Sequence, residues 1–312
     1  MKCRALSFKI KKNCGMLYSR ARFLGGLVNP EVIMKRLSAS FLAILLGFSL
    51  NAYAQESPQA ALSEGKVSEA LAMLDAQVAD ANAEKSVEGL CGKAQIALAQ
   101  GDHDTAAGLL ATASEKAKGL DKSSAWPVVV SWLQAEAARQ AGNEDEVRNI
   151  IDGAVKQMRS AKIKPEWAGA IYYLKALYPK DNSDGRDAAE EAIEAYDEAE
   201  MHHQKGHAMM RLAQLEWERD KKRRAVKAFE SAIKEFRNDG SVEAQRCMAE
   251  AQLILAEHFL EDGDMKAAKS RLEVAKKELE NVGNPEALVK RLAEAEARAA
   301  ETPKADDSQQ DT

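Results

Sequence analysis

The segment EMHHQKGHAMMR, residues 200 to 211, is the local stretch whose residue types are best suited to metal chemistry. His203 and His207 are four residues apart, so on a helix they would share one face. Three methionines add thioether sulfur to the same segment: Met201, Met209 and Met210. Histidine together with methionine suits copper, and the segment therefore suggests a copper-binding hypothesis. The alternative is a loop and a helix start, interrupted by Gly206, with two of the methionines in core positions.

The rest of the sequence gives no local sign of catalysis. Its five histidines fall into no nucleophile–base or metalloprotease arrangement, and phosphate-loop, dinucleotide-binding and GxSxG motifs do not occur. We therefore expect a protein that is not an enzyme and needs no cofactor. The acidic run EEAIEAYDEAE (190–200) is interpreted as a solvated helix face, and the basic run KKRR (221–224) as a solvated turn.

The elements that would position these residues repeat along the chain. Six times, a turn-forming residue is followed five positions later by a small residue, then by a large apolar residue at +4, and usually by a small residue at +7. The turn-forming residues are Gly65, Gly101, Gly142, Asp184, Asp220 and Gly263. The stripes that follow begin at Ala70, Ala106, Val147, Ala189, Ala225 and Ala268. Small–large–small at i, i+4 and i+7 lies on one helical stripe, and the small residues let a neighbouring helix approach closely.

Each copy has the pattern of two helices joined by a short turn, as in LCGKAQIALAQGDHDTAAGLLATA. This pattern resembles the tetratricopeptide repeat family over roughly residues 57 to 280. The repeat spacings of 36, 41, 42, 36 and 43 residues exceed the roughly 34 of that family, and its Trp, Gly-Tyr and Pro consensus is mostly missing. The resemblance implies an all-α, right-handed solenoid of about six helical hairpins. Asn284-Pro285-Glu286 then begins a capping helix that runs to about Ala300.

A start-like segment lies a tenth of the way along the chain, at residues 34–54. Lys35 and Arg36 precede an apolar run that is half the roughly 20 residues of a membrane-spanning helix. Ala52-Tyr53-Ala54 has the small-x-small form of a signal-peptidase site. We therefore expect a signal peptide cleaved after Ala54, a periplasmic or secreted protein, and no stable membrane anchor after cleavage.

Residues 1–33 are a basic upstream extension with three possible origins: a start assigned too early, a long positive head of the signal, or an organelle-targeting peptide. We favour the first, because the segment from Met34 is already complete. The expected organisation is the extension at 1–33, the signal peptide at 34–54, one solenoid at 55–300 and a disordered acidic tail at 301–312.

Charge and cysteine content exclude several classes of function. Without residues 1–54 the chain has 35 basic and 48 acidic residues, a net charge near −13. Such a surface repels nucleic acid, because affinity for phosphate backbones comes from Lys and Arg that displace counterions. Cys91 and Cys247 are the two cysteines of that part, and we interpret them as separate buried thiols rather than a disulfide framework.

In the tetratricopeptide family the first helices of the repeats line a concave groove that binds peptides. The resemblance places eight residues of this chain there: Trp132, Glu136, Arg139, Met210, Gln214, Trp217, Leu253 and Glu257. They lack the Lys/Asn/Arg clamp by which chaperone-binding members grip an acidic C-terminus. Their aromatic, apolar and acidic side chains suit a protein or peptide that is apolar with basic flanks.

The leading hypothesis is therefore a non-enzymatic scaffold or adaptor in the bacterial cell envelope, which binds another protein. Two alternatives stay open. One is a periplasmic copper-handling protein that uses the His/Met segment, and the other is a cytoplasmic regulatory protein of the tetratricopeptide type.

Overall fold

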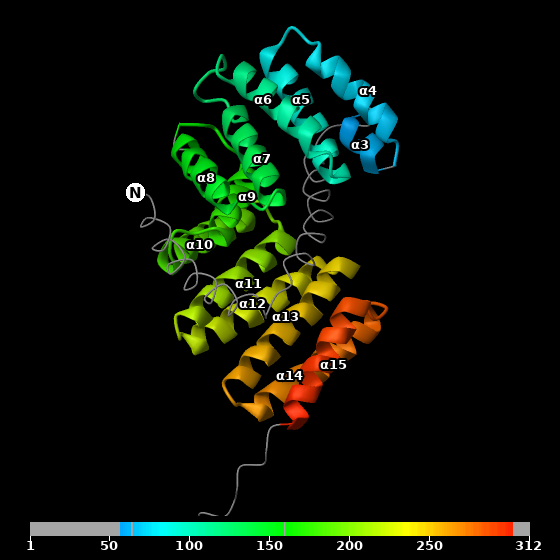
Figure 1. Ribbon diagram of the computed structural model, residues 1–312, viewed down its shortest axis with the longest axis vertical. Coiled ribbons are helices and arrows are strands. Elements are labelled where there is room, and N and C mark those ends of the chain that lie inside the picture. The colour runs from blue at the N-terminus through cyan, green and yellow to red at the C-terminus, as the bar shows by residue number, and fades with distance from the viewer. Residues whose placement is uncertain (1–56, 64, 159, 302–312) are drawn as a thin grey trace, which may run out of the picture. The chain divides into compact units, whose positions relative to one another are not determined.

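The computed structural model describes residues 57–63, 65–158 and 160–301, and all its regular elements in these ranges are α-helices (Figure 1). The described part of the chain forms two compact units, which divide between Gly119 and Leu120. The predicted leader segments and the residues after 301 lie outside the described ranges. Among the helices that are described, none is long and apolar enough to cross a membrane.

The first unit contains two helical hairpins. Its helices are α3 (Pro58–Ser63), α4 (Val67–Val78), α5 (Ala83–Gln100) and α6 (His103–Ala117). Helix α5 packs against both α4 and α6. Side chains cap two of these helices: Ser57 Oγ accepts a hydrogen bond from the Ala60 amide at 3.1 Å, and the Asp102 carboxylate accepts one from the Thr105 amide at 3.1 Å. Both bonds satisfy amides that the first turn of a helix leaves without a partner.

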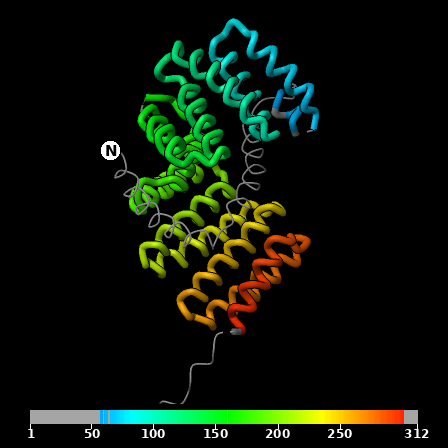
Figure 2. Tube along the Cα trace, viewed as in Figure 1, coloured from blue at the N-terminus to red at the C-terminus, as the bar shows by residue number. Residues whose placement is uncertain are grey.

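The second unit continues the same pattern through four hairpins and a final helix (Figure 2). Its helices are α7 (Trp126–Gln140), α8 (Glu144–Met158), α9 (Pro165–Leu177), α10 (Asn182–Glu198), α11 (His202–Glu218), α12 (Lys222–Asp239), α13 (Val242–Glu261), α14 (Met265–Asn281) and α15 (Glu286–Glu301). Each helix packs against the next one along the chain. The predicted all-α fold of six helical hairpins and a capping helix is confirmed.

The repeated stripe forms the core of both units. Its first residue is completely buried in all six copies: Ala70, Ala106, Val147, Ala189, Ala225 and Ala268. The turns that precede four of these stripes are glycines with φ between 75° and 77°: Gly65, Gly101, Gly142 and Gly263. A left-handed backbone at these positions favours glycine, which has no Cβ to clash. Sequence periodicity therefore identified both the buried face and the turns.

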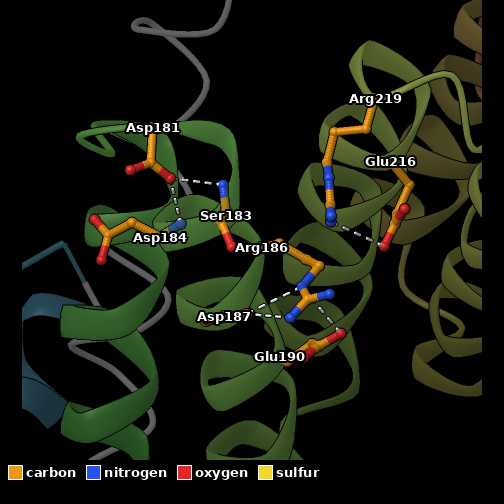
Figure 3. Close-up of polar contacts among 8 residues, drawn as sticks. All are labelled: Asp181, Ser183, Asp184, Arg186, Asp187, Glu190, Glu216 and Arg219. Atoms are coloured by element: carbon orange, nitrogen blue, oxygen red, sulfur yellow. Dashed lines mark hydrogen bonds and ion pairs between the residues drawn. The ribbon is translucent and has the colours of Figure 1, made fainter.

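The fourth hairpin corrects the predicted turn at Asp184. Pro179 follows the end of α9, and the Asp181 carboxylate caps α10 by accepting hydrogen bonds from the Ser183 and Asp184 amides at 2.8 and 3.0 Å (Figure 3). Asp184 therefore lies in the first turn of α10, and its carboxylate is 2.8 Å from Lys175 Nζ. The prediction was wrong because an acidic residue in a first helical turn resembles a turn former in sequence.

Alanine substitutions at two helical glycines of the second unit should change the free energy of unfolding in opposite directions. A Cβ on Gly206 would lie 2.6 Å from the Phe236 ring, which is completely buried, whereas a Cβ on Gly153 meets nothing within 4 Å. We expect Gly206→Ala to lower the free energy of unfolding by about 1–3 kcal/mol through overpacking. Gly153→Ala should raise it by about 0.5–1 kcal/mol, because alanine loses less backbone entropy in a helix. Urea unfolding measures the change in unfolding free energy for each variant. Equal changes in the two variants would contradict the close packing of Phe236 against Gly206.

Candidate partner-binding site

A hollow of about 740 Å³ is lined by residues of α10, α11 and α12. Helix α11 packs against both neighbours. Each helix contributes one stripe at helical spacing: Glu190, Ile193, Glu194 and Asp197 from α10; Lys205, Met209, Leu212 and Glu216 from α11; Arg224, Lys227, Ala228 and Ser231 from α12. We call these twelve residues the α10–α12 trough.

The trough has an apolar floor between two charged edges of opposite sign. Ile193, Met209, Leu212 and Ala228 form the floor, and each of them keeps part of its surface exposed. The α10 edge carries the exposed acids Glu190 and Glu194, and the α12 edge carries the exposed bases Arg224 and Lys227. Within the described part of the chain, the side chains of Glu194, Arg224 and Lys227 form no ion pair with another residue. An apolar strip with convergent charges is the usual composition of a recognition site.

One end of the trough is closed by internal ion pairs. Lys205 Nζ lies 2.6 Å from Asp197 Oδ1 and 3.0 Å from Glu235 Oε1, so this lysine connects α10 and α12 across α11. The hydrogen bond from Lys205 holds the pKa of Asp197 below its usual value. The charges at this end are therefore already paired within the protein.

The other end contains a buried carboxylate that is incompletely paired. Glu216 lines the trough and is only 4% exposed. Its Oε1 is 3.8 Å from Arg219 Nη1, and its Oε2 has no hydrogen-bond partner among the residues that the structure describes (Figure 3). The Arg186 side chain contacts Asp187 and Glu190 at this end (Figure 3). Because this oxygen has almost no accessible surface, Glu216 contributes negative charge to this end of the trough and not a direct contact for a partner.

The predicted groove residues lie elsewhere in the second unit, and most of them are buried. Six of the eight are at most 8% exposed: Trp132, Glu136, Arg139, Met210, Leu253 and Glu257. Gln214 and Trp217 are partly exposed. In this conformation the six buried side chains support the surface and do not present contact area to a partner.

Several of these predicted residues are engaged in contacts within the protein. Arg139 Nε donates a hydrogen bond to Glu136 Oε2 at 2.7 Å, and Arg291 Nε donates one to Glu257 Oε1 at 2.7 Å. The Trp217 ring stacks on His258, with ring centroids 4.4 Å apart. Sequence position alone cannot distinguish a groove residue from one half of an internal ion pair.

The His/Met segment is helical from His202 onward, where α11 begins, and Gly206 does not interrupt it. The structure brings together His203, His207 and a third potential ligand, Cys247 of α13, with their ligand atoms all within 4.8 Å of one another. The methionines pack in apolar clusters: Met201 with Tyr196 and Ala208, Met209 and Met210 with Phe236. The cysteine was missed because 40 residues separate it from His207.

Both edges of the trough lie in segments that the sequence analysis interpreted as solvated. The acidic edge comes from the run at 190–200, and Arg224 comes from the basic run at 221–224. The available signal was the spacing of the charges. The acids at 190, 194 and 197 share a face of the second helix of the fourth hairpin. The bases at 224 and 227 share a face of the second helix of the fifth hairpin.

The chain shares its fold with solved structures at low sequence identity. No protein-family model matches the sequence, and no curated protein matches it. The crystal structure of BtubC (BKLC) from P. vanneervenii aligns with TM-score 0.58 and 14% identity, over 74% of this chain and 94% of that one. The apo form of RapI aligns with TM-score 0.62 and 13% identity, over 85% of this chain and 72% of that one.

A third similar structure carries the repeat name in its description. It is a signal transduction ATPase with numerous domains, with a tetratricopeptide repeat sensor, from Pyrococcus horikoshii. It aligns with TM-score 0.54 and 14% identity, over 89% of this chain and 44% of that one. At these identities the similarity establishes a shared helical-repeat fold, and function must be argued from the surface.

Proposed function

We propose that this protein is a non-enzymatic scaffold that binds an amphipathic helix of another protein in the α10–α12 trough. The observation that carries the proposal is the partly exposed apolar floor between exposed charges of opposite sign, of which Glu194, Arg224 and Lys227 form no ion pair within the described residues. The apolar ridge of a helix, with anchors at i, i+3 or i+4 and i+7, fits such a floor between two flanking helices. Burial of Met209 and Leu212 would supply the apolar contact.

The charges of the trough define the partner further. The acidic edge, Glu190 and Glu194, calls for Lys or Arg on one side of the bound helix, and the buried Glu216 adds negative charge behind that edge. The basic edge, Arg224 and Lys227, calls for acidic residues on its other side. The trough therefore selects both the composition and the direction of the bound helix, because reversal would place like charges together. This refines the partner expected from sequence, which was apolar with basic flanks, by adding acidic residues on one side.

Selection from a displayed library of amphipathic helices, with the full chain as bait, tests the proposal. We expect selected helices to carry Lys or Arg on one edge and Asp or Glu on the other. Glu190→Lys with Glu194→Lys should weaken binding of a selected helix about tenfold or more, since two attractive rim pairs become repulsive. A helix with exchanged edges should recover affinity for that double variant.

The matched control is Glu191→Lys with Glu198→Lys. These two acids are exposed on the same helix but do not line the trough, and their replacement changes the net charge equally. Equal losses in the two double variants would show that binding follows overall charge and would refute the trough as the site. A selected set without edge polarity would refute it as well.

The proposed place of action is the bacterial cell envelope, after removal of the segment at 34–54. The support is the sequence of that segment, with its basic head, short apolar run and Ala-Tyr-Ala exit. N-terminal sequencing of the protein from envelope and cytoplasmic fractions tests the proposal. A start at Gln55 in the envelope fraction would support it. An intact start in the cytoplasm would favour the regulatory alternative.

A further inference from the structure

Three potential metal ligands converge between α11 and α13, outside the trough. His207 Nε2 lies 3.2 Å from His203 Nε2 and 3.5 Å from Cys247 Sγ. The two imidazoles are four residues apart on α11, and the thiol is supplied by the first helix of the next hairpin. Two nitrogens and one sulfur form a ligand set that suits zinc and copper.

The spacing of the ligand atoms matches a tetrahedral site. Zinc binds histidine nitrogen at about 2.0–2.1 Å and cysteine sulfur at about 2.3 Å. At tetrahedral angles, these bond lengths place two nitrogens about 3.3–3.4 Å apart and nitrogen and sulfur about 3.6 Å apart. The observed 3.2 and 3.5 Å are close to these edges. The third pair, His203 with Cys247, lies within 4.8 Å and needs an approach of about 1 Å.

Acidic charge lies near the two histidines. Asp239 and Glu243 act electrostatically on His203 and favour positive charge at its ring. The same carboxylates would favour a bound cation.

Packing fixes the orientation of the two rings. Phe236 of α12 contacts both edge to face, with ring centroids 5.6 Å from His203 and 5.2 Å from His207. The absence of a side chain at Gly206 admits the Phe236 ring at this position, because a Cβ there would lie 2.6 Å from it. The glycine inside the His/Met segment thus supports the ligand geometry and does not break the helix.

We infer that His203, His207 and Cys247 form a binding site for one Zn²⁺ ion, with the fourth position open to water or another small ligand. Coordination by the Cys247 thiolate releases the thiol proton to solvent, so affinity should increase with pH. The metal would connect α11 to α13, and hence the fifth hairpin to the sixth. This site uses the same two histidines as the copper hypothesis, with the Cys247 thiol as the third ligand in place of methionine.

Calorimetric titration of the reduced, metal-free full chain with Zn²⁺ tests the site. We expect one ion per chain and a higher melting temperature in its presence, because a ligand that binds the folded state stabilises it. His203→Gln and Cys247→Ser should each weaken binding more than the roughly 10–100-fold typical of changes around a site. With Co²⁺ as a probe, thiolate-to-cobalt charge-transfer absorption should appear in the parent and in His203→Gln, and be lost in Cys247→Ser.

The other three cysteines provide the control. A chain with Cys3→Ser, Cys14→Ser and Cys91→Ser keeps Cys247 alone and should bind like the parent. Burial raises the pKa of Cys91 to about 12, which makes it a poor ligand. Failure to bind Zn²⁺ at one ion per chain would overturn the site, as would unchanged binding in both ligand variants. Retention of Cu⁺ with rejection of Zn²⁺ would overturn the assignment to zinc. Because His203 is partly exposed, His203→Gln tests the site even if Cys247→Ser does not fold.

Discussion

Replacement of Arg139 by methionine is expected to lower the free energy of unfolding of the second unit by about 3–5 kcal/mol. The Arg139 and Glu136 side chains are each only 3% exposed, and they form a two-pronged pair one helical turn apart on α7. Without the guanidinium, the Glu136 carboxylate keeps one polar side-chain contact, from Gln140 Nε2 at 3.1 Å. An uncompensated buried charge is far more destabilising than the loss of an exposed ion pair.

The double variant Glu136→Leu with Arg139→Met separates charge from packing. It removes both charges while keeping comparable volume, so we expect its stability to lie within about 1 kcal/mol of the parent. Urea is the suitable denaturant because it is uncharged, whereas guanidinium chloride is a salt and would screen the ion pair. Tryptophan emission reports the second unit selectively, since all four tryptophans lie between residues 126 and 217. If the single and double variants were equally destabilised, volume rather than charge would explain the loss.

This experiment also decides between two roles for residues of the predicted groove. As contacts for a partner, Glu136 and Arg139 would affect binding and leave folding nearly unchanged. As a buried pair, they stabilise α7 and affect binding only through the fold. The burial of both side chains favours the second role.

The core of this protein is predictable from sequence because its information is local and repeated. A stripe such as Ala106, Leu110 and Ala113 lies within two helical turns, and the structure buries all three residues to 1% exposure or less. The turn at Gly101 has a left-handed backbone, and glycine at this position of the sequence indicates such a turn. Six copies of one local pattern were enough to place the core faces and five of the six turns, the exception being Asp184.

The candidate sites were less predictable because they combine residues from different hairpins. The trough requires that α10 and α12 lie on either side of α11, which sequence spacing alone does not show. Cys247 reaches His207 only because α13 packs next to α12, and from its sequence position we interpreted it as a buried thiol. Tertiary packing also decided burial: Trp132 and Leu253 resemble surface anchors by register but are enclosed in the fold.

Acidification is expected to destabilise the second unit through His258, by about 3 kcal/mol between pH 7 and pH 4. Burial lowers the pKa of His258 to about 4, with Arg291 acting in the same direction and Asp262 opposing it. The ring stacks on Trp217, and neither ring nitrogen has a hydrogen-bond partner among the described residues. Glu261 Oε2 is the nearest opposite charge, 3.6 Å from Nδ1.

The direction of the effect follows from proton binding in the two states. Between pH 6.5 and pH 4 the unfolded chain protonates this histidine and the folded protein does not, so falling pH favours unfolding by about 1.4 kcal/mol per unit. Above pH 6.5 both states are neutral and the dependence disappears.

His258→Phe keeps an aromatic ring against Trp217 and removes the titration. Its unfolding free energy should therefore decline less steeply between pH 6.5 and pH 4, with the largest gain over the parent at pH 4. His103→Gln, at an exposed position of the first unit, is the control and should leave the acid dependence of tryptophan emission unchanged. Parallel pH profiles for the parent and His258→Phe would mean that this imidazole does not remain neutral in the folded protein. The burial of His258 against Trp217 and Phe229 argues for divergence, because an imidazolium there would lose its hydration without gaining a hydrogen-bond acceptor.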